Sequence, residues 1–355
     1  MQSAQELAGV FRTQAGICGA MGSAFNQALG ERCAVDLDAG GRSAELLSPW
    51  FGRDARRLFA DAVALRWLGA FHDRALRGVD PPLTLAYPAP GRPGDPPAAW
   101  SAIETAMRDD PAELASFMQH EPQTNEVLRS ACLLPGFLAI ARATGLPLRL
   151  LELGASAGLN QFWDRYAYDF GAGGVWGEPA SPVRLAAEWR GPAPDLDQAV
   201  SVASRAACDR SPVGLEDSAA RRRLRAYVWP DQFERLGRLD AAVALARRER
   251  VTVERADALA FTRDRGAPQP GLATVIYHSI FWQYLPQETQ RGLADVIEAF
   301  GAQAKAEAPL AWLRMEPVAG NPSQIEVRLT LWPSGEERRL GACSPHGTWI
   351  APDPD

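Results

Sequence analysis

The feature that most constrains the fold is an apolar run, Leu148–Leu153, that enters a turn of small residues at Gly154–Gly158. Such a run is typical of a buried strand. Small residues let the backbone of the turn approach a ligand closely, and a helix beginning after it would offer unpaired N–H groups. Glu152 lies near the end of the strand, where open α/β sheets bind ligands. The segment therefore predicts a ligand site at the carboxyl edge of a parallel sheet.

Strand-like and helix-like patterns alternate from Leu148 onward, which predicts right-handed βαβ units and a parallel sheet. Near the end of the chain, Pro333–Glu336 separates two strand-like runs and predicts a hairpin. The expected strands are Leu148–Leu153, Val200–Ser204, Val251–Glu254, Ala273–His278, Leu310–Met315, Ile325–Trp332 and Glu337–Ala342. We therefore expect an α/β, Rossmann-like sheet of seven strands, mostly parallel, with an antiparallel last strand.

The region before this sheet has helical spacing of its apolar residues. A proline-rich stretch, 81–97, predicts a connecting loop. We expect a helical N-terminal domain or lid at 1–147 and a ligand-binding domain at 148–355. A hairpin inserted near 166–190 would explain the long separation between the first two strands.

The acidic residue two positions before the first glycine resembles the acidic-x-G-x-G-x-G signature of S-adenosylmethionine-binding proteins, although Ser156 replaces the middle glycine. The resemblance implies a class I methyltransferase fold, with Glu152 near the amino-acid portion of the ligand. It also implies that Gly154, Ala155, Ser156 and Gly158 contact the ligand. On this interpretation, filling the turn with Gly158→Leu would abolish binding.

Two acidic residues follow the next strands and extend this predicted cofactor site. Asp209 would hold the ribose hydroxyls, with Asp169 as a substitute because the separation from the first strand is unusually long. Asp257, with Ala258, would face the adenine amino group; a helix cap is the other interpretation of Asp257.

Two further interpretations of the turn remain open. The residues Gly154–Gly158 also match G-x-S-x-G, the nucleophile elbow of α/β hydrolases, with Ser156 as nucleophile. A turn that merely packs a helix on a strand is the simplest interpretation. The G-x-G-x-x-G spacing of dinucleotide enzymes is absent.

Polar and aromatic residues around the turn predict the place of the methyl acceptor. His278 and Ser279 end the fourth strand, and His278 is the candidate base because its ordinary pKa lies nearest neutrality. The residues expected to line the acceptor pocket are Gln123, Asn125, Asn160, Trp163, Asp164, Arg165 and Trp282.

Four short segments occur in a fixed order: Gln123–Val127, Glu152–Tyr166, Trp229–Gln232 and Trp282–Pro286. Together they resemble an uncharacterised bacterial family, domain of unknown function 2332, over nearly the whole chain. The family looks like a helical region fused to a methyltransferase-like domain, and it implies no established substrate.

Composition excludes several function classes. The net charge of -6 argues against general nucleic-acid binding. Lys305 is the sole lysine and fits neither a Walker A loop nor a Schiff-base site. The scattered cysteines and histidines show no metal-site spacing, and no segment is apolar and long enough for a membrane span. We expect a cytoplasmic protein with no bound metal and no membrane partner.

The sequence thus predicts an S-adenosylmethionine-dependent methyltransferase acting on an unknown small molecule or protein side chain. A serine hydrolase is the first alternative, and a non-catalytic S-adenosylmethionine-binding or scaffold protein is the second.

Overall fold

The computed structural model describes residues 2–353. The chain forms two compact units, and the first of them is discontinuous in sequence. It takes the chain up to Thr124 together with Glu216–Gly237, while the second takes Asn125–Leu215 and the chain from Arg238 onward. The boundary therefore falls at 124/125, not at 147/148, and a segment expected in the ligand-binding domain belongs to the helical unit.

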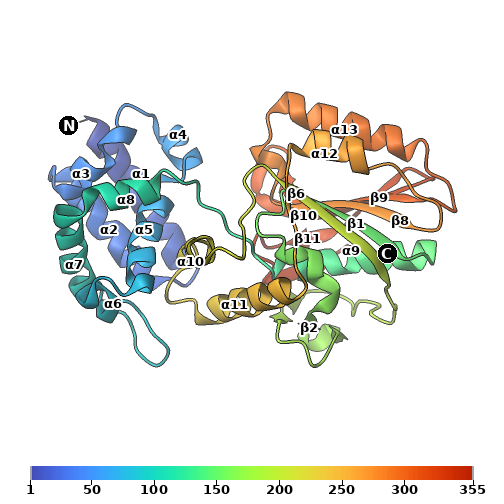
Figure 1. Ribbon diagram of the computed structural model, residues 1–355, viewed down its shortest axis with the longest axis horizontal. Helices are drawn as coiled ribbons and strands as arrows, with labels where there is room; N and C mark the ends of the chain where they lie inside the picture. Colours follow the sequence, from blue (N-terminus) through green and yellow to red (C-terminus); the bar gives the residue numbers. More distant parts are fainter. Residues whose placement is uncertain (1, 354–355) are drawn as a thin grey trace. The chain divides into compact units, whose positions relative to one another are not determined.

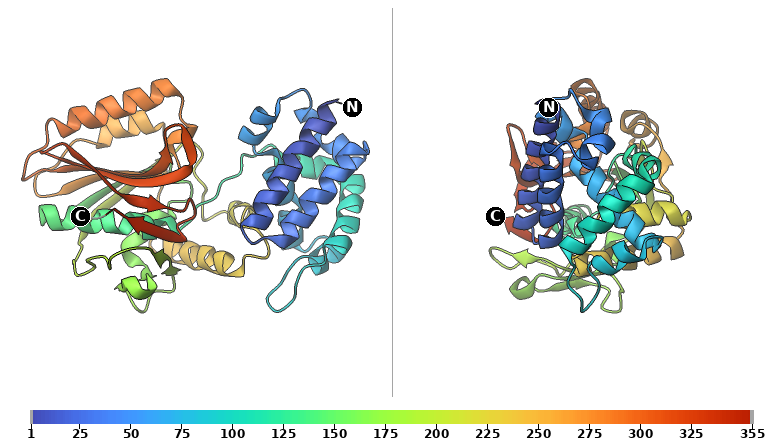
Figure 2. Two further views of the ribbon diagram at one scale, coloured as in Figure 1. Left: turned by 180° about the vertical axis from the view of Figure 1, so that it is seen from behind. Right: turned by 90° about the vertical axis from the view of Figure 1, so that its left-hand side faces the viewer.

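The first unit is built from helices only, among the residues described. The long pair α1 and α2 lies side by side (Figure 2). The helices are α1 (Gln2–Ala20), α2 (Ala24–Asp38), α3 (Arg42–Leu47), α4 (Ala55–Ala60), α5 (Val63–Arg77), α6 (Pro81–Ala86), α7 (Pro96–Asp109), α8 (Pro111–Met118) and α10 (Ser218–Ala226), with a 3₁₀ turn at Ser48–Trp50.

The proline-rich stretch is not simply the loop that the sequence predicts. Pro81 opens α6 and Pro96 opens α7, and each is preceded by an aspartate, Asp80 or Asp95, whose side chain caps the helix. Proline fits the first turn of a helix because its missing N–H would have no partner there. The same residue type therefore starts two helices and leaves only the segment between them as a loop.

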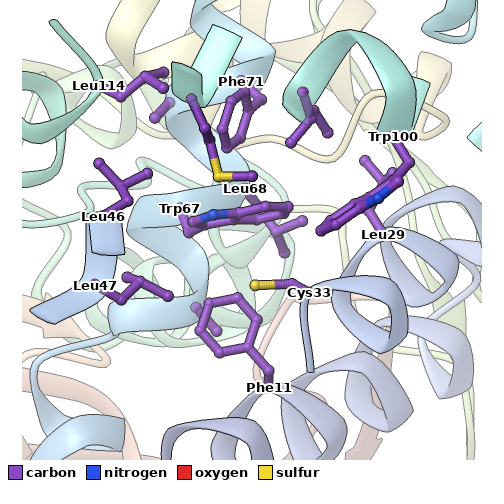
Figure 3. Packing of buried hydrophobic residues seen from close by; sticks show 14 of the residues in the cluster. Phe11, Leu29, Cys33, Leu46, Leu47, Trp67, Leu68, Phe71, Trp100 and Leu114 are labelled. Atoms are coloured by element: carbon purple, nitrogen blue, oxygen red, sulfur yellow. The ribbon is translucent and has the colours of Figure 1, made fainter. Parts of the chain in front are cut away.

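A buried tryptophan lies at the centre of the helical core. Trp67 on α5 packs against Phe11 and Phe71 with ring centroids 5.7 and 4.7 Å away, and Trp100 lies 6.1 Å away (Figure 3). Trp229, from the returning segment, joins the same cluster. Each of these large rings buries a large apolar area in the core of the unit.

The returning segment is tied to the helical unit by polar contacts. The Asp231 carboxylate accepts hydrogen bonds from the Ser23 Oγ at 2.6 Å and from the Phe25 N–H at 3.1 Å, at the start of α2. Gln232 donates to the Met21 carbonyl at 3.1 Å. The motif Trp229–Gln232 thus fastens residues 216–237 to the first unit.

The second unit contains a mixed, mostly parallel sheet of nine strands in the order β5-β12-β11-β10-β9-β8-β1-β6-β7. The parallel strands are β1 (Leu148–Leu153), β6 (Val202–Asp209), β7 (Glu254–Arg255), β8 (Ala273–Ser279) and β9 (Leu310–Val318). An antiparallel meander follows in β10 (Asn321–Trp332), β11 (Glu336–Cys343) and β12 (Trp349–Pro352), and β5 (Glu188–Trp189) completes the sheet beyond β12.

Helices cover both faces of this sheet (Figure 1). On one face, α12 (Ala258–Arg265) and α13 (Gln287–Gly301) pack against apolar side chains of the parallel strands, including Leu151 and Ile276. On the other face lies α9 (Arg129–Thr144), whose Gly136 fits closely against Leu313 of β9. The division between the units falls within α11 (Phe233–Arg248).

The predicted count of seven strands is wrong, because β12 and β5 extend the sheet to nine. The insertion also differs from the expected hairpin. It forms a separate sheet in which β2 (Ala167–Asp169) pairs antiparallel with β3 (Val175–Gly177) and parallel with β4 (Arg184–Ala186). The glycines between Phe170 and Val175 allow the tight return that places β3 beside β2.

We expect Asp231→Ala to destabilise the protein by about 1–2 kcal/mol, because it leaves two donors at the start of α2 without their acceptor. Urea unfolding measures the change in the free energy of unfolding. The matched control is Glu234→Ala, which removes an exposed carboxylate three residues later in the chain. Equal stability of the two variants would contradict the fastening role of Asp231.

Candidate functional site

The order of the parallel strands reverses beside β1. The chain moves outward from β1 to β6 and β7, and then returns to β8 and β9 on the opposite side of β1. Ligands of open α/β sheets bind at the carboxyl ends of the strands where the order reverses in this way. The turn after β1 and the loop after β8 flank this switch point.

The turn after β1 has the backbone of a glycine loop even though its middle glycine is missing. Gly154 and Gly158 have φ angles of +67° and +73°, and Ser156 has a φ of +53°. A left-handed conformation is uncommon for a serine. Ser156 therefore takes the conformation that glycine would adopt without strain, and its Oγ is buried with no hydrogen-bond partner.

The helix expected after the turn is a short 3₁₀ helix, Leu159–Arg165. Its first N–H group is already used, because Leu159 donates to the Oδ1 of Asn125 at 2.9 Å. The predicted set of unpaired N–H groups is therefore wrong at this position. The charged groups nearest to the turn are its acidic neighbours.

Three carboxylates surround the turn from three neighbouring strands. Glu152 lies in β1 and is 4% exposed, Asp209 ends β6, and Asp257 follows β7. All three raise the pKa of the buried Cys208 thiol, whose burial is the larger cause, to about 12. Among the described residues, no arginine, lysine or histidine forms an ion pair with any of the three.

Glu152 is a buried acid with a raised pKa. Burial is the main cause of the shift, a hydrogen bond from the Tyr277 hydroxyl at 3.4 Å lowers the pKa, the nearby Asp209 raises it, and the resulting pKa is about 8. The group is therefore mostly protonated near neutral pH. A cation placed beside it would favour the charged form.

Asp209 and Asp257 each bind backbone N–H groups. The carboxylate of Asp209 accepts from Ser156 and from Ser211, each at 2.8 Å, which joins the end of β6 to the glycine turn. Asp257 caps α12 by accepting from Leu259 and Ala260 at 2.9 and 3.2 Å, and Ala258 begins that helix. Asp169 lies in the small sheet, where it accepts from Gly171.

Two residues predicted to line the acceptor pocket are buried and bonded within the protein. Asn125 accepts from Leu159, as described above. The Oδ1 of Asn160 accepts from Ser130 at 2.8 Å, and its Nδ2 donates to the Glu126 carbonyl at 3.4 Å. The structure therefore brings Asn125 and Asn160 to the turn, but as groups that fix its shape. Gln123 falls in the first unit and is not part of this set.

The remaining predicted lining residues divide between core and surface. Trp163 is fully buried and stacks on Phe137 at 4.1 Å. Both carboxylate oxygens of Asp164 accept from Arg205 at 2.6 Å, while Arg165 is exposed. Trp282 stacks on the ring of His278 at 5.5 Å. Trp163 and Asp164 thus stabilise the unit. The Nε1 of Trp163 is buried without a hydrogen-bond partner.

His278 has no free ring nitrogen in this arrangement. The Trp312 indole donates to its Nε2 at 3.1 Å, so the proton of the neutral ring lies on Nδ1 and is donated to Glu316 at 2.6 Å. The side chain is also fully buried. We therefore assign His278 no proton transfer. Beside it, the carbonyl of Ser279 accepts from Arg129 at 3.5 Å.

Glu316 and Phe281 are the site residues that sequence reasoning missed. Glu316 lies on β9, and its carboxylate accepts from His278 and from the Phe281 N–H. The ring of Phe281 covers Gly154 so closely that a Cβ on that glycine would collide with it. An acid near the end of a predicted strand was the one available signal for Glu316.

Gly158 faces protein atoms. A Cβ there would lie 2.7 Å from Val253 and 2.9 Å from Val251. Gly158→Leu would therefore disrupt packing before β7, and a loss of ligand binding in that variant would not locate the ligand.

The chain belongs to a family of uncharacterized proteins conserved in bacteria, DUF2332, whose model matches residues 8–351. No curated protein and no solved structure matches the chain. Among the described residues there is no cluster of histidine, cysteine and acidic side chains that could hold a metal ion, and no helix has the length and apolar character needed to cross a membrane.

The buried state of Glu152 predicts a specific pH dependence of stability. The pKa rises on folding from 4.5 to about 8, so the folded protein binds a proton in this interval that the unfolded chain releases. The free energy of unfolding therefore falls as pH rises from 4.5 towards 8, by at most about 1.4 kcal/mol per pH unit. Glu152→Gln should remove that slope.

The measurement is chemical unfolding of the wild type and of Glu152→Gln between pH 5 and pH 8, the interval in which the contribution of Glu152 changes most. Glu307→Gln, at an exposed position, is the control and should follow the wild type. Parallel curves for the wild type and Glu152→Gln would show that the carboxylate is not held in its neutral form.

Proposed function

We propose that this member of the DUF2332 family is an S-adenosylmethionine-dependent methyltransferase whose ligand binds around the turn Gly154–Gly158. The observation that carries the proposal is the set of acids Glu152, Asp209 and Asp257 around a left-handed turn at the switch point, with no cation among the described residues paired to them. S-adenosylmethionine carries a sulfonium and an ammonium group. It would bring positive charge to acids that no described cation of the protein pairs with.

Each acid has a distinct role in the proposal. Glu152 would pair with the ammonium of the amino-acid portion, where a cation offsets the cost of ionising a buried carboxyl group. Asp209 would hold the ribose hydroxyls with the lone pairs that its two backbone bonds leave free. Asp257 and Ala258, at the start of α12, would face the adenine amino group.

The backbone of the turn would contact the rest of the ligand. Gly154 and Ala155 have no long side chain to keep a ligand away from the backbone. The Oγ of Ser156 is buried without a partner, and a ligand carboxylate would give it an acceptor. Unpaired buried hydroxyl groups cost free energy, so this group is a specific point of attachment for a polar ligand.

When bound, S-adenosylmethionine supplies an electrophilic methyl group on its sulfonium. The acceptor would have to approach from the side opposite the sulfur, so the contribution of the chain is to position both molecules. Because both ring nitrogens of His278 are engaged, the proposal requires an acceptor that already has a free lone pair or loses its proton to solvent. The acceptor is a small molecule or a protein side chain.

One observation favours the hydrolase alternative. Ser156 combines a positive φ with an unpartnered Oγ, as the nucleophile of a G-x-S-x-G elbow would. Two findings weigh against it. Among the described residues no strand of the large sheet precedes β1, whereas hydrolases usually have several before the elbow, and no histidine is bonded to the Ser156 hydroxyl. A non-catalytic role in binding S-adenosylmethionine differs from the proposal only in the absence of turnover.

The test is titration calorimetry with S-adenosylmethionine near pH 7 in buffers of different ionisation enthalpy. Binding should release roughly one proton, because the cation converts a mostly protonated Glu152 to its ionised form. Glu152→Gln should abolish this release and weaken binding by about tenfold, the effect of losing ~1.4 kcal/mol of charge pairing. Asp264→Asn, which neutralises an exposed acid on α12, should bind like the wild type.

The competing hypothesis predicts a different pattern. A serine-directed phosphonate that labels Ser156, in a protein whose melting temperature does not respond to S-adenosylmethionine, would favour the hydrolase. Binding of S-adenosylmethionine without proton release, and unchanged by Glu152→Gln, would place the ligand elsewhere on the protein.

A further inference from the structure

A short loop connects β8 to α13 and lies directly over the glycine turn. It contains Phe281 and the 3₁₀ turn Trp282–Tyr284. The Phe281 ring covers the face of Gly154 from which a Cβ would project, and it packs against the apolar cluster shared by the sheet, α12 and α13. The bare backbone of the first glycine is therefore shielded by an aromatic side chain.

The loop is anchored by one carboxylate on the neighbouring strand. The two oxygens of Glu316 lie 3.0 and 3.2 Å from the Phe281 N–H, and one of them also accepts from His278. The Ile280 N–H donates to the Met315 carbonyl at 2.9 Å. Hydrogen bonds to a charged acceptor are stronger than bonds between neutral groups, so Glu316 is the principal tie on this loop.

The residue that leads from β8 into the loop is strained. Ile280 has a φ of +49°. This conformation is a genuine outlier for a β-branched residue, and it persists only where the surroundings impose it. If the hydrogen bonds to Glu316 broke, the backbone of Ile280 could relax. The strain at Ile280 therefore lowers the free energy needed to move the Phe281 ring away from Gly154.

We propose that Phe281 controls access to the glycine turn, with Glu316 as the positioning residue that keeps its ring over Gly154. This inference rests on the proposed function, because it names the step that precedes ligand binding at the same site. A ligand that reaches the backbone of Gly154 must displace the ring. The open arrangement is therefore the one that the ligand selects, and the covered arrangement lowers the apparent affinity.

The first experiment measures, without any ligand, how strongly Glu316 holds the loop. Hydrogen–deuterium exchange is followed by mass spectrometry for the peptide that covers 280–285. Glu316→Ala removes the acceptor and should raise exchange in this peptide by about tenfold. Glu316→Gln retains an acceptor oxygen and should restore most of the protection.

Glu337→Ala is the matched control, because Glu337 pairs with Arg314 and Arg328 on the same sheet and forms none of the bonds that hold the loop. Exchange in 280–285 that is the same in Glu316→Ala and Glu337→Ala would overturn the role of Glu316.

The second experiment measures the association rate of S-adenosylmethionine as a probe of access to the glycine turn. Phe281→Ala should raise the association rate about tenfold if the open arrangement is populated to roughly one part in ten in the wild type. Tyr284→Ala is the control, because it removes an aromatic ring from the same loop that is 73% exposed. Weaker binding in Phe281→Ala would overturn the proposal, since the ring would then be a fixed wall of the site.

The outcomes separate this inference from the proposed function. S-adenosylmethionine that binds with the same association rate in the wild type, Phe281→Ala and Tyr284→Ala would leave the methyltransferase proposal intact and overturn access control by Phe281. If no variant binds S-adenosylmethionine, including Phe281→Ala, the proposed function is refuted. The control of ligand access by Phe281 is then refuted with it. Glu316 would then be judged by the exchange experiment alone.

Discussion

The second unit is organised around one buried carboxyl group. Glu152 is placed by β1 at the centre of the sheet, where β6 and β8 flank it and little water reaches it. An ionised carboxylate in such a place is costly unless it is paired or well hydrogen-bonded. The Tyr277 hydroxyl offers one long hydrogen bond, and Asp209 adds negative charge close by. The fold therefore holds this carboxyl group mostly in its protonated form near neutral pH, with its pKa raised to about 8.

Most of the other polar groups near this site fix its shape. Asn125 and Asn160 bind the chain on both sides of the turn, and Asp209 ties the turn to β6. The Asn125 segment and the glycine turn, which lie far apart in sequence, thus form one rigid structure. Asp231 serves the same purpose in the helical unit, where it caps α2. Motifs that suggest chemistry in the sequence can thus be required for architecture alone.

The sequence predicts the parallel strands well, because long apolar runs such as Leu148–Leu153 and Ala273–Ser279 are buried on both faces of the sheet. It misses β5, and it places β7 at Val251–Glu254 although the strand lies at Glu254–Arg255, because two residues are too few to carry a periodic pattern. The positions of Glu152 near the end of β1 and of His278 near the end of β8 follow from neighbours in sequence. The hydrogen bonds of His278 to Trp312 and Glu316 could not be predicted, because these residues come from another strand.

The two sides of the switch point carry the same kind of side chain in opposite surroundings. Glu316 on β9 accepts from an imidazole and a backbone N–H, so its charge is satisfied within the protein. Glu152 on β1 has only the long contact from Tyr277. A carboxylate that is already satisfied is suited to hold structure, while an unsatisfied one is suited to hold a ligand. Phe281 connects Glu316 to the turn beside Glu152, because its N–H donates to Glu316 and its ring packs over Gly154.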